Sequence, residues 1–337
     1  MTATATVTAT TAAQQPVLSL RDVRVGSRHR REVRDIVRGV NLDVLPGEKV
    51  GVVGESGSGK TLTMLSMLRL LPRPLEVLGG EIFFENRNIT DLDERGMQSV
   101  RGGGVAMVYQ DPMTSLNPLL RVRTQLVETL RAHGAGKAAA HERTREVLGQ
   151  VGFVDPERVA AAFPHELSGG MVQRVMIAMA ISTSPRLLVA DEPTTALDVT
   201  IQQQILDLVD SLQARTAMAV VWVSHDLGVI ARLVDRVCVM YAGRVVESAP
   251  TVQLFDRPTH PYSRALLGSL PGPEVEHRAQ LTQIGGSPPD PTMLQAGCPF
   301  RARCPYAFER CAEEEPPLLD RGHGSFAACW REPDTWS

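Results

Sequence analysis

Residues 54–61 read GESGSGKT, which fits the phosphate-binding pattern G-x-x-x-x-G-K-[ST]. They follow the apolar run KVGVVG (49–54), typical of a buried strand, and precede a predicted helix. Glycines allow tight turns, so successive N–H groups can surround a phosphate at the helix N-terminus, where the helix dipole favours anions. The sequence therefore predicts a nucleotide site with Lys60 on the β- and γ-phosphates and the Thr61 hydroxyl on Mg²⁺. The predicted nucleotide-binding residues are Gly54, Glu55, Ser56, Gly57, Ser58, Gly59, Lys60 and Thr61.

Short valine-rich runs alternate with longer helical patterns, which is typical of a parallel sheet covered by helices. Four runs are expected to be buried strands: KVGVVG (49–54), GVAMVYQ (104–110), RLLVADE (186–192) and MAVVWVSH (218–225). Each ends in polar residues or glycine. Because ligands bind at the carboxyl ends of strands in open parallel sheets, we expect these four ends to face one site.

The remaining chain divides by its patterns. VLSLRDVRV (17–25) and IVRGVNLDV (36–44) alternate as antiparallel strands do, and 111–167 shows helical periodicity without a strand pattern. RVCVMYAGRVVESA (236–249) predicts a hairpin that turns at Ala242 and Gly243, and a short helix is expected around 260–270. We predict a disordered leader (1–15), a nucleotide-binding domain (16–270) with a helical subdomain (about 111–167), and a Pro/Gly-rich linker with a cysteine-bearing tail (271–337).

Asp191 and Glu192 end the run LLVADE. Alone, an acidic pair at a strand end is as easily a structural cap. Beside a phosphate loop, Asp191 is predicted to hold Mg²⁺ and Glu192 to act as the general base on the attacking water. His225 ends the fourth run and is predicted to be functional for the same reason, although a lone histidine at a strand end is more often structural.

HELSGGMVQRVMIAMAI (165–181) predicts a second anion-binding helix end. Ser168, Gly169 and Gly170 open a helix whose apolar residues recur at helical spacing. One chain thus carries two such helix ends more than 100 residues apart.

With these motifs the chain resembles the ATP-binding subunits of ABC transporters over roughly residues 16–270. The phosphate loop, VYQDP with Gln110, the signature LSGGM, LLVADEP, ALD (196–198) and SHD (224–226) follow in the family's order. The resemblance implies an ABC-type P-loop α/β fold with a mostly parallel sheet, an antiparallel β subdomain and a helical insertion. It implies a head-to-tail dimer in which Ser168, Gly169, Gly170 and Gln173 contact the ATP of the partner subunit.

The same resemblance assigns further roles. Gln110 is expected near the Mg²⁺ and the attacking water, linked through the helical insertion to the membrane subunits. Asp198 is expected at the dimer interface and His225 at the γ-phosphate. Mg²⁺ would be held through Thr61, Gln110 and Asp191.

The strings YQDPMTSLNPLLRV (109–122), HPYSRALLGSLP (260–271) and GCPFRARCPYAFERC (297–311) are similar to the dipeptide, oligopeptide and nickel importer branch. This implies an ATPase that powers import of peptides or related solutes with a second ATPase subunit, two integral membrane permeases and, indirectly, a substrate-binding protein. The alternative is an ATPase of a soluble complex, of the DNA-repair, ribosome or phosphonate-breakdown type.

Four of the five cysteines lie in the last 40 residues, spaced Cys298-x5-Cys304-x6-Cys311-x17-Cys329. Clustered thiols in a cytoplasmic chain more often bind metal than form disulfides, and four thiolates suit Zn²⁺ or an iron–sulfur cluster. The importer resemblance favours a [4Fe–4S] cluster, with zinc or no metal as alternatives, and its expected role is to fold a tail too short to build a core. The fifth, Cys238, is predicted to be a buried core thiol.

Composition is that of a globular protein, with 43% hydrophobic and 22% charged residues among 337. A net charge of -3 gives no general reason to bind nucleic acid, so we expect no nucleic-acid partner. The N-terminus lacks the features of a secretory signal, and no run of 18 apolar residues occurs. We expect a peripheral protein at the cytoplasmic face of the cell membrane, bound to permeases.

Overall fold

The computed structural model describes residues 14–29, 32–194, 198–269, 284–290 and 295–336. The chain divides into two compact units, the first built from 1–44, 49–90 and 223–337 and the second from 45–48 and 91–222. Most of the predicted leader and of the linker at 271–283 lies outside the described residues. The domain boundaries at 15 and 270 stay a prediction.

An antiparallel sheet in the first unit contains the two strands expected at its N-terminal end. The strand order is β2-β1-β4-β5, and Leu18 of β1 pairs with Val44 of β2. The strands are β1 (Leu18–His29), β2 (Glu32–Val44), β4 (Leu75–Phe84) and β5 (Arg87–Asn88). The sequence pattern missed β4 because two glycines interrupt LEVLGGEIFF. Gly80 has a φ of 86°, and a Cβ there would lie 2.3 Å from the Asp22 carbonyl oxygen, so glycine permits the close approach to β1.

A second set of strands in the first unit has the order β11-β12-β10-β9-β3. β3 and β9 are parallel, and the other neighbours are antiparallel. The predicted hairpin is confirmed: β9 and β10 are joined at Ala242 and Gly243, with φ of 47° and 80°. The strands are β3 (Lys49–Val53), β9 (Arg236–Tyr241), β10 (Arg244–Pro250), β11 (Leu319–Gly322) and β12 (Ser325–Ala327).

Short helices complete the first unit. They are α1 (Lys60–Met67), α9 (Leu227–Leu233), α10 (Thr251–Asp256), α11 (Pro261–Gly268), α12 (Glu309–Glu313) and the 3-10 turns η3 (Arg301–Arg303) and η4 (Pro333–Thr335). The helix expected around 260–270 is α11. Cys238 in β9 is 2% exposed, which confirms its place in the core.

The cysteine-bearing tail shares the core of the first unit. Its strand β12 pairs with β10, with Glu247 opposite Ala327. Its Phe300 is 1% exposed and lies edge-on against Tyr241 and Tyr262, with ring centroids 5.3 and 5.4 Å away. The tail therefore does not build a core of its own, as expected, but packs on strands and aromatic rings that belong to the rest of the unit. The role of a bound metal in folding the tail stays a prediction.

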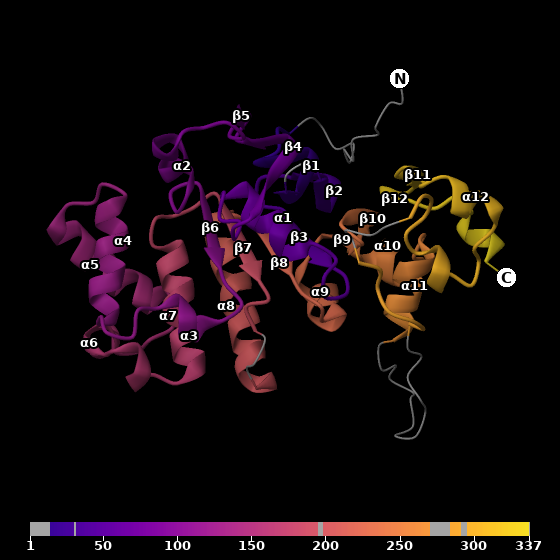
Figure 1. Cartoon of the computed structure of the whole chain (residues 1–337). Coiled ribbons are helices and arrows are strands. Elements are labelled where there is room, and N and C mark those ends of the chain that lie inside the picture. Colours follow the sequence, from indigo (N-terminus) through magenta and orange to yellow (C-terminus); the bar gives the residue numbers. More distant parts are fainter. Residues whose placement is uncertain (1–13, 30–31, 195–197, 270–283, 291–294, 337) are drawn as a thin grey trace. The chain divides into compact units, whose positions relative to one another are not determined.

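The second unit contains the other expected buried strands, β6 (Val105–Val108), β7 (Leu187–Asp191) and β8 (Ala219–Val223), in the order β8-β7-β6. β6 and β7 are parallel, and every residue of β7 and β8 is buried, as valine-rich runs predict. Its helices are α2 (Glu94–Val100), α3 (Pro112–Ser115), α4 (Val122–Ala132), α5 (Lys137–Gln150), α6 (Pro156–Ala161), α7 (Gly169–Ile181), α8 (Val199–Thr216) and the 3-10 turn η1 (Pro164–Glu166). Helices α4, α5 and α6 pack side by side and form the expected helical insertion (Figure 1).

A buried polar group ties β10 to the loop before α11. The Glu247 carboxylate, fully buried, accepts hydrogen bonds from the Thr259 and His260 N–H groups at 2.6 and 2.9 Å. His260 Nδ1 accepts from the Tyr262 N–H at 3.0 Å and so caps α11. Burial lowers the pKa of His260 to about 3 and raises the pKa of Glu247, against the hydrogen bonds it accepts.

We expect His260 to make the first unit less stable in acid. Its pKa is depressed in the folded chain, so its contribution is complete above the unfolded value of about 6.5 and is lost as the pH falls towards 3. For each pH unit that the pH falls within that window, the free energy of unfolding decreases by up to about 1.4 kcal/mol. Denaturant unfolding at several pH values measures the slope.

His260→Asn is the matched control, because asparagine can cap the helix but does not titrate. Glu247 is present in both proteins, and because its pKa is raised, it makes the folded state more stable as the pH falls. The difference between the two proteins in the slope of unfolding free energy against pH therefore isolates His260. Equal slopes for the two proteins would contradict the prediction.

Candidate functional site

The phosphate loop in the first unit depends on glycine where it leaves β3. Gly54 has a φ of 150°, and a Cβ there would lie 2.2 Å from the Met240 carbonyl oxygen on β9. Gly59, with a φ of 97°, is the N-cap of α1. The strand, loop and helix therefore follow one another as the motif predicts, with the helix N-terminus opening at the loop.

Lys60 and Thr61 begin helix α1. Lys60 is 6% exposed, and its ammonium group donates to the carbonyl oxygens of Gly54 and Glu55 at 2.7 and 3.0 Å. It thereby lies across the mouth of the loop. The Thr61 side chain beside it is exposed.

Tyr262 contacts the loop as well, although no sequence motif predicted a role for it. Its hydroxyl accepts a hydrogen bond from the Glu55 N–H at 2.8 Å. Tyr262 is fully buried, and burial raises its pKa, so it stays a neutral phenol. The only signal in the sequence was that Tyr262 lies in one of the strings shared with the importer branch.

Three predicted site residues lie together in the second unit, where β6 and β7 end side by side. Asp191 is the last residue of β7 and is 3% exposed. Glu192 follows with a φ of 46°, a conformation that non-glycine residues rarely adopt, and its carboxylate accepts from the Gln110 amide at 3.1 Å. Two of the four strand ends therefore do bring polar side chains together, as the parallel pairing predicts.

The signature helix α7 opens as expected. The Ser168 side chain is its N-cap and accepts from the Met171 N–H at 3.4 Å, and Ser168 and Gly169 are exposed. A Cβ on Gly170 would lie 2.7 Å from Ile201 Cγ2, so glycine allows α7 to approach α8 closely. Gln173, in contrast, is fully buried, which does not suit the predicted direct contact with a nucleotide on a partner subunit.

Asp198 caps a helix, and His225 lies at the end of the fourth predicted strand. The Asp198 carboxylate accepts from the Ile201 N–H at 2.9 Å and caps α8. Its neighbours in the motif, Ala196 and Leu197, lie outside the described residues. His225 is exposed after β8, within the first unit.

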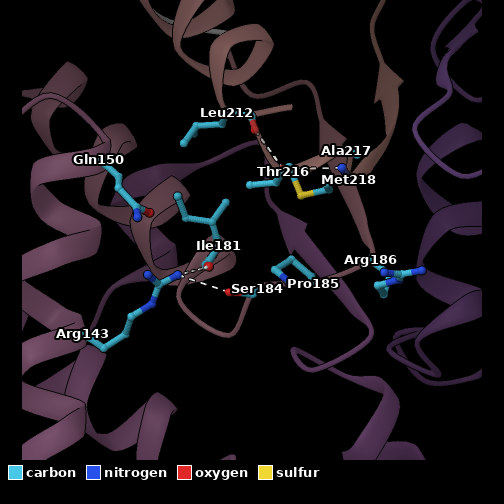
Figure 2. A pocket seen from close by; sticks show the side chains of 10 residues that line it. All are labelled: Arg143, Gln150, Ile181, Ser184, Pro185, Arg186, Leu212, Thr216, Ala217 and Met218. Atoms are coloured by element: carbon cyan, nitrogen blue, oxygen red, sulfur yellow. Dashed lines mark hydrogen bonds between the residues drawn. The ribbon is translucent and has the colours of Figure 1, made fainter. Parts of the chain in front are cut away.

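A pocket of about 270 Å³ in the second unit lies at the other end of α7 (Figure 2). Arg143 of α5 points into this region and donates to the carbonyl oxygens of Ser182 and Ile181 at 3.0 and 3.4 Å. A guanidinium suits the negative end of a helix dipole. Arg143 thus ties the helical insertion to the end of the helix that carries the signature at its start.

The four cysteines of the tail line one small pocket, together with Phe300. Burial, reinforced by the other three thiols, raises the pKa of Cys298 to about 12. Burial also raises the pKa of Cys304 and Cys329. Within the described residues, however, no three or more His, Cys, Asp or Glu side chains are arranged so that they could hold a metal ion. The thiols are gathered, but as arranged they do not fit the predicted [4Fe–4S] cluster or a zinc ion.

Comparison with known proteins decides the family. Residues 37–195 match the family model described as ABC transporter, and residues 246–311 match that of the oligopeptide/dipeptide transporter C-terminal region. A probable peptide ABC transporter ATP-binding protein from Sinorhizobium fredii is 49% identical, with 94% of this chain and 95% of that protein covered. This chain belongs to the ABC transporter family.

Two further relatives of this ABC protein agree with that result. The oligopeptide transport ATP-binding protein OppD of Bacillus subtilis is 44% identical over 93% of this chain and 88% of its own. A dimeric ATP-binding cassette solved with ADP and phosphate is 28% identical, with a TM-score of 0.61, and covers 69% of this chain and 98% of its own. The predicted ABC-type fold is confirmed. The named relatives are transport proteins, which does not favour the soluble-complex alternative.

The tail match has an informative boundary. It ends at residue 311, so it includes Cys298, Cys304 and Cys311 but not Cys329.

Among the described residues, no helix combines the length and apolar character needed to cross a membrane.

We expect Gly170→Ala to destabilise the second unit by about 1–3 kcal/mol, the usual effect of overpacking. The added methyl would displace Ile201, whose branched side chain cannot rotate away freely, and would move α7 from α8. Urea unfolding measures the change.

Gly149→Ala in α5 is the control, because nothing lies within 4 Å of its Cβ position. Alanine there should stabilise the helix by up to about 1 kcal/mol. If both variants were stabilised alike, the close approach at Gly170 would not be a packing constraint.

Proposed function

We propose that this chain is the ATP-hydrolysing subunit of an importer for peptides or related small solutes. The observation that carries the proposal is the match of residues 246–311 to the oligopeptide/dipeptide transporter C-terminal region. Relatives named for peptide and oligopeptide transport, aligned over more than 90% of the chain, support it. The chain works at the cytoplasmic face of the membrane with a second ATPase subunit, two permeases and a substrate-binding protein.

The first unit supplies the phosphate-binding groups. Backbone N–H groups of the loop and the N-terminus of α1 bind the phosphate oxygens, and Lys60 exchanges its contacts with loop carbonyls for the β- and γ-phosphates. This exchange costs little, because the ammonium already lies across the loop. His225 contacts the γ-phosphate.

The second unit supplies the hydrolytic groups. Glu192 accepts a proton from the attacking water, and the Gln110 amide, which already donates to its carboxylate, orients it. Ser168, Gly169 and Gly170 open α7 towards the nucleotide of a partner subunit, where the exposed helix end favours an anion.

The residues that would hold Mg²⁺ are oxygen donors, as this ion prefers. They are Asp191, a buried carboxylate at a strand end, the Gln110 side chain in the same unit, and the Thr61 hydroxyl of the first unit. When bound, Mg²⁺ neutralises charge on the phosphate oxygens.

Glu192→Gln should lower ATP turnover by at least about 100-fold, the usual contribution of a general base, because the amide cannot take the proton from water. ATP binding should remain, since the phosphate loop is untouched. Steady-state hydrolysis and equilibrium binding of ATP measure the two effects. Glu142→Gln, on the exposed face of α5, is the matched control and should change neither.

The same variant tests the transport function in cells. A strain that lacks this subunit should grow on defined peptides when it carries the wild-type gene and not when it carries Glu192→Gln. Full turnover by Glu192→Gln would remove its role as base. Peptide uptake that does not depend on the subunit would remove the import function.

We also propose that the four tail cysteines bind a [4Fe–4S] cluster, or else zinc. All four thiols line one pocket, which supports this proposal. Among the described residues, however, they are not arranged so that three or more could hold a metal ion. Protein purified without oxygen should contain about four irons and matching sulfide for a cluster, or about one zinc. The absence of both metals, with Cys304→Ser as stable as the wild type, would contradict metal binding.

A further inference from the structure

Arg303 of the tail forms a two-pronged ion pair with Glu55 of the phosphate loop. Its Nη1 and Nη2 atoms donate to the two carboxylate oxygens of Glu55 at 2.7 and 2.9 Å. The two residues lie 248 positions apart in the sequence and belong to the same unit. The Arg303 side chain is 5% exposed and that of Glu55 is 24% exposed, so solvent weakens this pair less than it weakens an exposed one.

The guanidinium of Arg303 is fixed on its other sides as well. Nε donates to the Gly285 carbonyl oxygen at 2.9 Å, and Nη2 lies 3.3 Å from that of Ile284. Nη1 reaches the Tyr241 hydroxyl at 3.3 Å, and the group lies 5.9 and 6.0 Å from the ring centres of Tyr241 and Phe300. A guanidinium held by this many partners is positioned before any ligand binds.

Glu55 is in turn held at two points that do not depend on Lys60, which leaves the Glu55 carbonyl oxygen when it binds the phosphates. The Glu55 carboxylate binds Arg303, and the Glu55 N–H donates to the Tyr262 hydroxyl. Because Glu55 is the second residue of the loop, these contacts set the backbone from which the phosphate-binding N–H groups project. Without Arg303, a bare carboxylate would also stand in the loop that receives the negative phosphates.

We propose that Arg303 is a positioning residue for ATP, which holds the phosphate loop in its binding conformation and neutralises Glu55. The inference rests on the proposed ATP hydrolysis and adds that the tail is part of the nucleotide site. The η3 turn that carries Arg303 is held at both ends by cysteine backbone, because Arg301 N–H donates to Cys298 and Cys304 N–H donates to Arg301. A change in the geometry of the cysteine turns therefore reaches the phosphates through this ion pair.

The test measures ATP affinity and turnover of Arg303→Ala in the full chain. Affinity for ATP should fall about tenfold, a change of about 1.4 kcal/mol, and the KM should rise by a similar factor. Turnover at saturating ATP should fall much less, because the hydrolytic residues are untouched. The ATP affinity of Arg303→Lys should lie between those of the wild type and Arg303→Ala, because lysine keeps the charge but cannot bind both oxygens of Glu55.

Glu315→Gln is the matched control for docking of the tail. Glu315 also forms a two-pronged ion pair from the tail, with Arg38 at 3.2 and 2.8 Å, but it does not contact the phosphate loop. This variant should bind ATP within about twofold of the wild type. Thermal unfolding of all variants reports whether the tail remains folded.

Glu55→Gln completes a double-mutant cycle. In the Arg303→Ala background it should restore part of the lost affinity, because it removes the unpaired carboxylate, so the two effects should not add. Arg303→Ala with wild-type affinity, equal losses in Arg303→Ala and Glu315→Gln, or strict additivity would each overturn the inference. A wild-type protein that binds no ATP would overturn the proposed function as well.

Discussion

The phosphate loop is held by its close packing against the turn between β9 and β10. The Gly243 N–H donates to the Ser58 carbonyl oxygen at 3.1 Å, and there is no room for a side chain at Gly54 because of Met240. The parallel pairing of β3 with β9 sets this geometry, since it brings the end of one strand beside the turn of the other. The anion-binding conformation is thus a property of strand pairing as much as of the loop sequence.

The tail extends the same support. β12 pairs with β10 just beyond the turn, and Phe300 packs against Tyr241 and Tyr262. Each of these contacts joins the tail to a strand or ring next to the phosphate loop. The tail therefore shares the core of the first unit, and two of its cysteines lie in the turns that carry Arg303.

The sequence was informative where a local pattern sets the structure. The loop at 54–61, the hairpin at Ala242 and Gly243, and the cap at Ser168 each follow from residue type and spacing. Period-2 and valine-rich runs located the buried strands for the same reason. The ends of β6 and β7 were expected at one site, and there the Gln110 amide donates to Glu192, because neighbouring parallel strands end at one edge of the sheet.

What the sequence could not give are contacts between segments far apart that follow no repeating pattern. Neither β4, interrupted by two glycines, nor the ion pair between Glu55 and Arg303 has a local signature. Gln173 is a second example: it belongs to the signature motif and was predicted to contact a nucleotide, but its side chain on α7 is fully buried. In the sequence, Arg303 looks like an ordinary surface charge, one of several arginines in the tail. Its ion pair with Glu55 and its place beside the rings of Tyr241 and Phe300 distinguish Arg303 from its neighbour Arg301, and both come from residues far away in the sequence.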